Sequence, residues 1–258
     1  MNLQAKPLVR AVRCDYTADD ETVYQALVRA TAPLERVWAR LSSAKRITIK
    51  FNQAWNPAEM PFYRGRYREL VDPAVARATL RLLRERTNAD LRCVEIATMI
   101  RNRDDLSFEQ AMNLGAVLSE YGITTENGNT AAHRICPVPG GGSMFSQYQL
   151  PESVVDTDAF VTVQKIKNHK FMGVTLGLKN LFGLPPYDPW GRPRQYFHHL
   201  VRLPYVLVDL GRIIDPALTI LDGLTAQSGA EWGGEGLVGN TLMAGDQVIA
   251  TDAVATHL

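Results

Sequence analysis

Alternating and periodic apolar residues divide the chain into strands and helices that follow one another in regular succession. Period-two runs of β-forming residues predict strands at 47–51, 91–98, 160–164, 218–221 and 241–244. Apolar residues at helical spacing predict helices at 19–41, from 73 to 86, leading up to 121, at 196–214 and at 247–257. A strand followed by a helix, repeated about five times, predicts an α/β fold with a mainly parallel central sheet and helices on both faces. We expect a single domain over 1–258, in which 1–44 form an arm and a helix and 45–258 form the core.

Local capping signals indicate where several of these helices begin. Asp72 followed by Pro73 is typical of an N-cap and the first helical position. Ser107 with Gln110 has capping-box spacing. Pro33 should bend or split the first helix, and Asp246 can cap the last one.

Long loops are expected at the carboxyl ends of the strands, where loops carry function. Residues 126–149 show no sustained periodicity and contain several glycines, so we predict a lid or binding loop, more mobile than the sheet, that borders a pocket. The aromatic and arginine-rich segment 53–70 is either a loop with half-buried rings or a substrate-facing lid or subunit contact. Residues 228–239 read as a glycine-rich loop.

The stretch 161–183 concentrates the polar residues on which the functional hypothesis depends. Lys165, Lys167 and His169 end its predicted strand. Lys179 lies farther on, within a mainly apolar segment, so at least the stem of its side chain should be buried. A buried amine must find an anion or lose its proton, and perturbed lysines often mark functional sites.

Spacing within this stretch gives two further expectations. Gly173 and Gly177 are four residues apart and would share one face of a helix, as would Thr175 and Lys179. We predict that Gly173 permits close approach of the backbone to a strand or a ligand. We also predict that the ammonium of Lys179 faces the same pocket as Lys167 and contacts either the anion of the ligand or an acidic partner such as Glu126, Asp222 or Glu231.

Polar residues follow the other predicted strands at the same position. Lys50 and Asn52 end one strand, Glu95 lies near the end of the next, and Asp222 and Asp246 end two later ones. In open α/β sheets the ligand crevice lies outside the carboxyl ends of the strands, so these side chains should converge on one edge. Ordinary turn or capping roles explain the two aspartates equally well, whereas lysines at these positions favour an anion such as carboxylate or phosphate.

The residues KIKNHKFMGVTLGLKNLFG at 165–183 carry a family resemblance. They resemble the signature of the family called domain of unknown function 362. Three weaker matches are ITIKFN at 47–52, LDG at 221–223 and AGDQVIATDA at 244–253. The resemblance implies that His198 or His199 aligns with a later family histidine. It also implies that the natural chain is longer, and many resembling chains carry a cysteine-rich iron–sulfur segment that this chain lacks. A remote analogy, at the level of fold alone, is to lactate racemase-like enzymes that use lysine and histidine around a nickel-bearing nucleotide.

These observations select the candidate residues. The candidate catalytic residues are Lys167, His169 and Lys179. The candidate substrate-binding residues are Lys50, Asn52, Glu126, Lys165, Thr175, Asn180, His198, His199, Asp222 and Glu231. A lysine amine of lowered pKa can act as a general base or imine-forming nucleophile, and His169 can move a proton. We assign no metal ligand, and the cofactor is left open.

Composition and net charge limit the classes of partner that the protein can bind. The formal net charge of +1, from 28 basic and 27 acidic residues, provides no electrostatic surface for nucleic acid or membrane. No apolar stretch approaches the length of a membrane span, so we expect a cytoplasmic protein, with homo-oligomer formation left open. The three cysteines are far apart and indicate no disulfide framework or paired metal site. Sequence patterns for dinucleotide binding, a Walker phosphate loop, a serine nucleophile elbow and HExxH zinc are absent.

Two functions remain. The first is an enzyme that acts on a small anionic substrate by lysine and histidine acid–base chemistry. The second is a non-catalytic accessory module that binds a metal, an iron–sulfur cluster or an anionic cofactor for a partner. A bound metal or cofactor in the purified protein would favour the second function, or a nickel-dependent version of the first.

Overall fold

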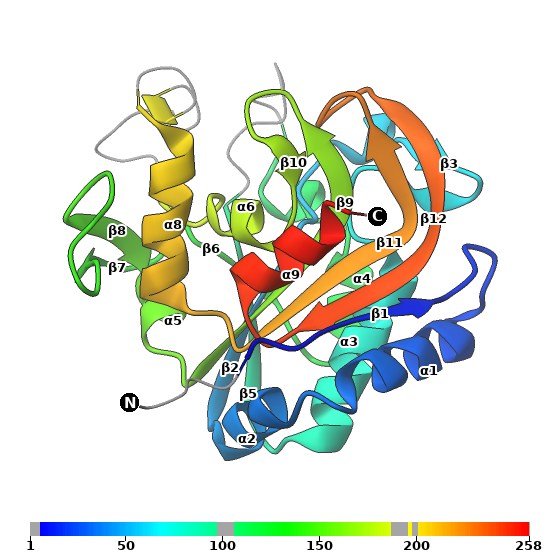
Figure 1. Ribbon diagram of the computed structural model, residues 1–258, viewed down its shortest axis with the longest axis horizontal. Coiled ribbons are helices and arrows are strands. Elements are labelled where there is room, and N and C mark those ends of the chain that lie inside the picture. Colours follow the sequence, from blue (N-terminus) through cyan, green and yellow to red (C-terminus); the bar gives the residue numbers. More distant parts are fainter. Residues whose placement is uncertain (1–5, 97–105, 187–195, 198–200, 258) are drawn as a thin grey trace.

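The computed structural model describes residues 6–96, 106–186, 196–197 and 201–257. An eight-stranded sheet crosses the molecule in the order β1-β12-β11-β9-β2-β5-β6, with β10 paired to β9 (Figure 1). Its strands are β1 (Val9–Arg13), β2 (Arg46–Phe51), β5 (Asp90–Glu95), β6 (Thr125–Asn127), β9 (Ala159–His169), β10 (Gly173–Thr175), β11 (Leu218–Ser228) and β12 (Glu235–Gly245). Two hairpins lie outside it, formed by β3 (Phe62–Tyr63) with β4 (Arg66–Tyr67) and by β7 (His133–Pro137) with β8 (Gln147–Pro151).

The centre of this sheet is parallel, as the alternation of strands and helices predicts. Strands β11, β9, β2, β5 and β6 pair with one another in the same direction. Strands β1, β12 and β10 are added antiparallel. The carboxyl ends of the five parallel strands therefore lie at one edge of the sheet.

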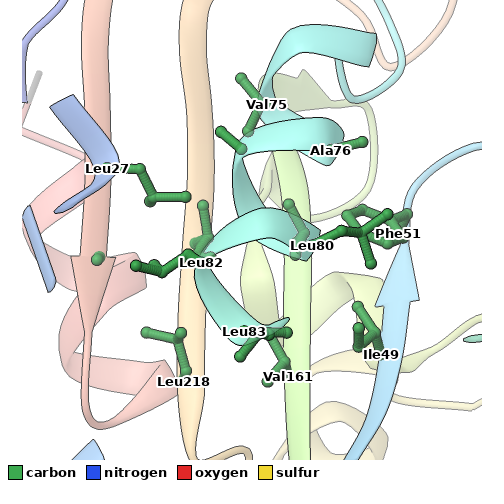
Figure 2. Close-up of a cluster of buried hydrophobic side chains, with 14 of the residues drawn as sticks. Leu27, Ile49, Phe51, Val75, Ala76, Leu80, Leu82, Leu83, Val161 and Leu218 are labelled. Carbon is green, nitrogen blue, oxygen red and sulfur yellow. The ribbon is translucent and has the colours of Figure 1, made fainter. Parts of the chain in front are cut away.

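Helices cover both faces of the sheet, which confirms the predicted layers. The helices with both ends in the described residues are α1 (Asp20–Thr31), α2 (Glu35–Ser43), α3 (Pro73–Arg86), α4 (Gly115–Glu120), α5 (Glu152–Val155), α6 (Gly177–Leu181), α8 (Leu203–Ile214) and α9 (Val248–Ala255), with 3-10 turns at η1 (Pro57–Glu59) and η2 (Glu109–Ala111). On one face, α3 places Leu80 and Leu83 against the strand residues Ile49 and Val161 (Figure 2). On the other face, α6 and α8 pack around Phe160. The two-residue period of the strands produces this division, since Phe160 and Val161 point to opposite faces.

The signals at Pro33, Asp72 and Ser107 operate at the predicted residues. Pro33 separates α1 from α2. The Asp72 carboxylate accepts a hydrogen bond from the Ala74 backbone N–H at the start of α3. Ser107 and Gln110 bond each other's backbone N–H through their side chains, although this box begins the short turn η2 and not a long helix.

Three predicted segments differ from the structure. Residues 126–149 contain β6, β7 and the start of β8, so the predicted long lid is a hairpin. Its tip is held by Asp209 of α8, whose carboxylate accepts from the backbone N–H groups of Ser143, Met144 and Phe145 and from the Tyr148 hydroxyl. The predicted loop 228–239 is shortened by β12, which begins at Glu235. The helix expected over 196–214 is interrupted: residues 196–197 are helical, 201–202 are not, and α8 begins at Leu203 with proline in its first turn.

Candidate functional site

A cavity of about 240 Å³ lies at the carboxyl edge of the parallel strands. Its wall comes from the ends of β2, β5 and β9, from β10 and α6, and from the loop between β11 and β12. The lining residues are Lys50, Asn52, Ala54, Trp55, Glu95, Gln164, Thr175, Lys179, Asn180, Phe182, Gly183, Glu231 and Trp232. Six candidates from distant parts of the sequence are thus brought together: Lys50, Asn52, Thr175, Lys179, Asn180 and Glu231.

Lys50 is neutralised within this wall. Its ammonium donates to the Glu95 carboxylate at 2.7 Å and to the Asn180 carboxamide oxygen at 3.2 Å, and both charged side chains are buried. The Asn180 amide nitrogen donates in turn to the Lys50 and Val163 carbonyls and to the Thr162 hydroxyl. Asn180 therefore fixes α6 to the ends of β2 and β9. Glu95 was not among the candidate residues. Its carboxylate compensates for the desolvation of the buried Lys50 ammonium.

Lys165 does not line the cavity. It pairs with Asp222 at 3.0 Å, and neither side chain is exposed. The two residues are direct neighbours in the parallel pairing of β9 and β11. Asp222 also accepts from the backbone N–H of Asp72 at the start of α3. Because successive side chains of a strand alternate, Gln164 faces the cavity while Lys165 faces the α3 side of the sheet.

Burial raises the pKa of Asp222, and the adjacent Lys165 ammonium opposes that rise. The pair is a structural feature of the strand ends on the α3 face. The sequence placed Lys165 and Asp222 at the correct edge of the sheet, but both belong to the face opposite the cavity.

The loop between β11 and β12 brings two further groups to the cavity, Glu231 and Trp232. The Gln227 amide nitrogen donates to the carbonyls of Ala230 and Glu231, at 2.8 and 2.9 Å. The Gly233 backbone N–H donates to the Glu69 carboxylate at 2.6 Å. Side chains outside the loop thus fix the backbone on both sides of Trp232.

His169 is oriented toward Glu231 and not into the cavity. Its Nδ1 accepts from the backbone N–H groups of Phe171 and Met172, at 3.0 and 3.2 Å. A nitrogen that accepts two such bonds carries no proton, so the ring proton lies on Nε2. Nε2 lies 2.8 Å from the Glu231 carboxylate. His169 therefore holds Glu231 in place.

Glu231 is kept ionised by its surroundings. Burial alone would raise the pKa of its carboxyl, but the hydrogen bond from His169 and the charges of Lys179 and Lys167 outweigh burial and hold the pKa well below the ordinary value. Of the three acidic partners predicted for Lys179, Glu231 is the one that lines the same cavity.

Lys167 stands behind the cavity wall. Its ammonium donates to the Glu69 carbonyl at 3.0 Å and lies 3.8 Å from the centre of the Trp232 ring. Trp55 stacks on Trp232 with ring centres 4.2 Å apart. Two groups this close to one ring centre cannot share a face, so Trp232 is held between Lys167 and Trp55. The segment 53–70 thus contributes Trp55 to the cavity wall, while the rings of Trp55, Tyr63 and Tyr67 are half-buried, as the first of its two interpretations expects.

The glycines of the central stretch have different roles from those predicted. Gly173 lies in β10 with φ +76°, and a Cβ there would meet no atom within 4 Å, so the predicted close approach at this position is wrong. Close approach occurs at Gly177, where a Cβ would lie 2.5 Å from the Thr219 side chain. Gly177 also donates to Asp252, which the candidate set omitted and which links α9 to the first turn of α6.

Two further polar residues singled out in the sequence, Glu126 and Asp246, lie elsewhere in the structure. The Glu126 carboxylate accepts from the Ser153 hydroxyl and lines a separate shallow polar hollow, so it does not share the cavity. Asp246 lies at the opposite edge, because β12 runs antiparallel and its carboxyl end meets the start of β11. There Asp246 pairs with Arg36 at 2.7 Å, and Gln247 caps α9 in its place. His198 and His199 lie outside the described residues.

The predicted lid 126–149 does not border the cavity. Its hairpin lines another hollow of about 220 Å³, whose residues are Ile135, Phe145, Gln147, Tyr148, Gln149, Pro185, Pro186, Tyr196 and Phe197. The hairpin packs against α8 because Asp209 satisfies its backbone N–H groups. The residues that close the cavity come instead from the loops after β2 and β11.

No group of three histidine, cysteine, aspartate or glutamate side chains in the described ranges is arranged to hold a metal ion. Within the same part of the chain, no helix has both the length and the apolar character needed to cross a bilayer. The three cysteines are buried and carry no disulfide.

Comparison with solved structures identifies a fold relative. The lactate racemase apoprotein from Thermoanaerobacterium thermosaccharolyticum superposes with a TM-score of 0.55, covering 95% of this chain and 56% of that chain at 13% identity. At this identity the likeness shows the fold alone, and it agrees with the analogy drawn from the sequence.

Comparison of sequences identifies a relative and a family. Over 120 residues the chain is 31% identical to a thylakoid-associated protein of Synechocystis sp., a match that covers 44% of this chain and 36% of the relative. The chain therefore spans little more than half of the racemase and about a third of the Synechocystis protein. The family model described as Domain of unknown function (DUF362) matches residues 47–257. Because this match includes all the parallel strands and every residue of the cavity wall, the chain belongs to the DUF362 family.

Proposed function

We propose that this protein is an enzyme that acts on a small molecule carrying a carboxylate or phosphate group. The observation that carries the proposal is that Lys179 and Glu231 line one cavity, where the Lys179 charge helps to lower the pKa of Glu231 and His169 lies 2.8 Å from the Glu231 carboxylate. Perturbed ionisable groups in a concave site enrich for catalysis.

The roles of the three catalytic candidates divide by position. Lys179 is at the cavity wall, where its ammonium lies 4.3 Å from the centre of the Phe182 ring. It is the group that would hold the anion of the substrate and exchange a proton with it. Lys167 and His169 act one layer behind, through Trp232 and Glu231 respectively. They are positioning residues in this proposal.

The cavity has polar atoms to spare for a ligand. Among the described residues, the Asn52 carboxamide oxygen and the Thr175 hydroxyl are buried without a hydrogen-bond partner. Both residues line the cavity. A buried polar atom without a partner costs about 1–3 kcal/mol, which a bound ligand would recover.

The test is turnover of a defined pool of small carboxylic and phosphoric acids by the purified chain in D₂O. Mass spectrometry and NMR would follow every pool member, so that proton removal from carbon is also recorded. We expect one member to change with wild-type protein and with Lys170→Met, which alters an exposed lysine of the same stretch. We expect no change with Lys179→Met.

Elemental analysis and mass spectrometry of the purified protein separate the two functional hypotheses. If no member of the pool is converted and the purified protein contains a stoichiometric metal or cofactor, the accessory-module hypothesis would be favoured over the enzyme hypothesis. Equal turnover by Lys179→Met and wild type would show that Lys179 has no catalytic role.

A further inference from the structure

We infer that Asp252 is a positioning residue for the cavity, whose carboxylate holds the first turn of α6 and whose protonation loosens that hold. The inference rests on the proposed function, because α6 carries Lys179 and Asn180, two side chains of the cavity wall. Asp252 belongs to the segment 244–253 that the sequence singled out, and that segment, described throughout, adds no side chain to the wall.

Asp252 joins α9 to the start of α6, and the two helices lie side by side (Figure 1). One carboxylate oxygen accepts from the Gly177 backbone N–H at 2.9 Å, and the other accepts from the Leu178 backbone N–H at 2.8 Å. Both N–H groups belong to the first turn of α6, where a helix supplies no acceptor of its own. The carboxylate therefore satisfies them from a neighbouring element.

The backbone at Gly177 fits closely between α9 and β11. A Cβ there would lie 2.5 Å from the Thr219 side chain, and 3.2 Å from both the Asp252 carboxylate and the Val248 side chain. Because glycine has no Cβ, the backbone can approach the carboxylate directly. A change at the carboxyl group consequently acts on the backbone of α6.

Lys179 lies between two anchors of α6. Asp252 holds the backbone before it, and the Asn180 side chain after it is bonded to the ends of β2 and β9. The five residues Gly177–Leu181 are too few to form a stable helix without such outside contacts. Loss of the first anchor should therefore displace the Lys179 ammonium relative to Glu231, on whose pKa its charge acts.

Protonation of Asp252 changes this anchor near neutral pH. The residue is partly exposed, but its carboxyl is enclosed against α6, and this burial raises its pKa to about 7 although the two backbone hydrogen bonds oppose the rise. A protonated carboxyl keeps one good acceptor oxygen in place of two, and its hydrogen bonds are no longer charge-assisted. The start of α6 should therefore be held firmly above about pH 7 and more loosely below it.

The charged side chains around α9 do not set this titration. In the described part of the chain, none of those on α6, β1, β11 and β12, which pack against α9, contributes to the raised pKa of Asp252. They are Lys179 in the cavity wall, Asp222 in its pair with Lys165, Glu235 at the start of β12, and the exposed Arg10 and Arg13 of β1. Beyond the two ends of α9, His257 is exposed and Asp246 is paired with Arg36.

NMR of the purified chain tests the inference without a substrate. The backbone N–H signals of Gly177 and Leu178 report the charge of Asp252, because a hydrogen bond to a carboxylate is stronger than one to a neutral carboxyl. Biosynthetic ¹³C labelling at lysine Cε gives Lys179 a signal of its own, which Lys179→Arg would assign. That signal reports a change in the surroundings of the ammonium.

Three observables should change together in the wild type. We expect the N–H signals of Gly177 and Leu178 and the Cε signal of Lys179 to share one inflection near pH 7. The Asn180 backbone N–H, which donates to the Leu176 carbonyl, should exchange about fivefold faster below that pH after correction for the intrinsic rate, since charged hydrogen bonds are about twice as strong as neutral ones.

Asp252→Asn offers one acceptor oxygen and does not titrate. It should abolish the shared inflection and give the faster exchange of Asn180 at every pH. Asp19→Asn is the matched control, because the Asp19 carboxylate also caps a helix, α1, and does not line the cavity. This control should leave the inflection and the exchange of Asn180 unchanged.

Several results would overturn the inference. An inflection of the Lys179 signal that persists in Asp252→Asn would belong to another group, such as His169 beside Glu231. If Asp252→Asn does not fold, the wild type still decides, since different midpoints for the Lys179 and Gly177 signals would show that the two are not linked. Failure of the proposed function is a separate outcome, because it is read as absence of turnover in the pool assay, whereas these signals require no substrate.

Discussion

Lys165→Met would leave Asp222 as a buried carboxylate without its counterion. Both side chains are completely inaccessible, and the ammonium lies 3.0 Å from the carboxylate. At an effective dielectric constant of about 20, unit charges at this distance attract by about 5 kcal/mol. Removing one partner of a buried pair typically costs about 3–5 kcal/mol, so we expect the free energy of unfolding to fall by that amount.

Urea unfolding at pH 7 would measure the loss. Arg134→Met is the matched control, because Arg134 pairs with Asp156 at 2.7 Å with both side chains more than 40% exposed. An exposed pair of this kind contributes about 0–1 kcal/mol. If Lys165→Met lowers the free energy of unfolding by no more than Arg134→Met does, the assignment of Lys165 to a structural pair is refuted.

The pH dependence gives a second test with a defined sign. Burial raises the pKa of Asp222, so the folded state binds a proton more readily than the unfolded state. The contribution of Asp222 to stability therefore falls as pH rises from its unfolded pKa toward its folded one. Without Lys165 the folded pKa should rise further. The deficit of Lys165→Met should accordingly shrink as the pH is lowered from 7 toward 4, and a deficit independent of pH would contradict this reasoning.

Three further changes test other parts of the structure. Glu231→Gln should lower the free energy of unfolding at pH 7, because the folded state holds the wild-type carboxyl at a lowered pKa. This loss should disappear as the pH falls from the ordinary pKa of the carboxyl toward its lowered pKa in the folded protein, and urea unfolding at a series of pH values would measure it. Gly177→Val should lower the unfolding free energy by about 1–3 kcal/mol through overpacking against Thr219, whereas Gly173→Asn, at a positive φ with open space, should change it by less than about 1 kcal/mol. Asp209→Ala should expose the three backbone amides at the tip of the β7–β8 hairpin to hydrogen exchange, and unchanged protection there would show that Asp209 does not anchor it.

Much of the edge where the site lies could be predicted from the sequence. Strand periodicity locates the ends of β2 and β9, and parallel strands necessarily bring those ends to one edge. This reasoning places Lys50 and Lys167 correctly at that edge. The same reasoning treated the predicted strand 241–244 as parallel to the others, which is false for β12. Nothing in the local pattern around Asp246 reports strand direction, because direction is set by the partner strand and not by the residues themselves.

The contents of the cavity were harder to predict than its position. The partners Glu95 and Asp222 are separated from their lysines by 45 and 57 residues, and no local spacing encodes such pairs. The sequence reasoning also did not predict which face of the sheet each lysine lies on. It grouped the lysines by strand end and did not use the two-residue alternation that places Gln164 and Lys165 on opposite faces. That alternation was visible in the sequence and could have divided the candidates correctly. The stacking of Trp55 on Trp232 joins two loops and was not predictable from either.

The buried ion pairs at the strand ends neutralise most of the charge that the strands bring to that edge of the sheet. Four charged side chains at the strand ends, Lys50, Glu95, Lys165 and Asp222, cancel in two buried pairs. Buried pairs of this kind contribute little net stability over apolar residues, so stability alone does not explain them. They do fix α6 and the start of α3 against the strand ends, through Asn180 and through the Asp72 backbone. Of these two pairs, only Lys50–Glu95 lines the cavity, and it supplies a buried and nearly neutral part of the wall. The Lys165–Asp222 pair lies on the other face of the sheet, where it holds the start of α3 against the ends of β9 and β11.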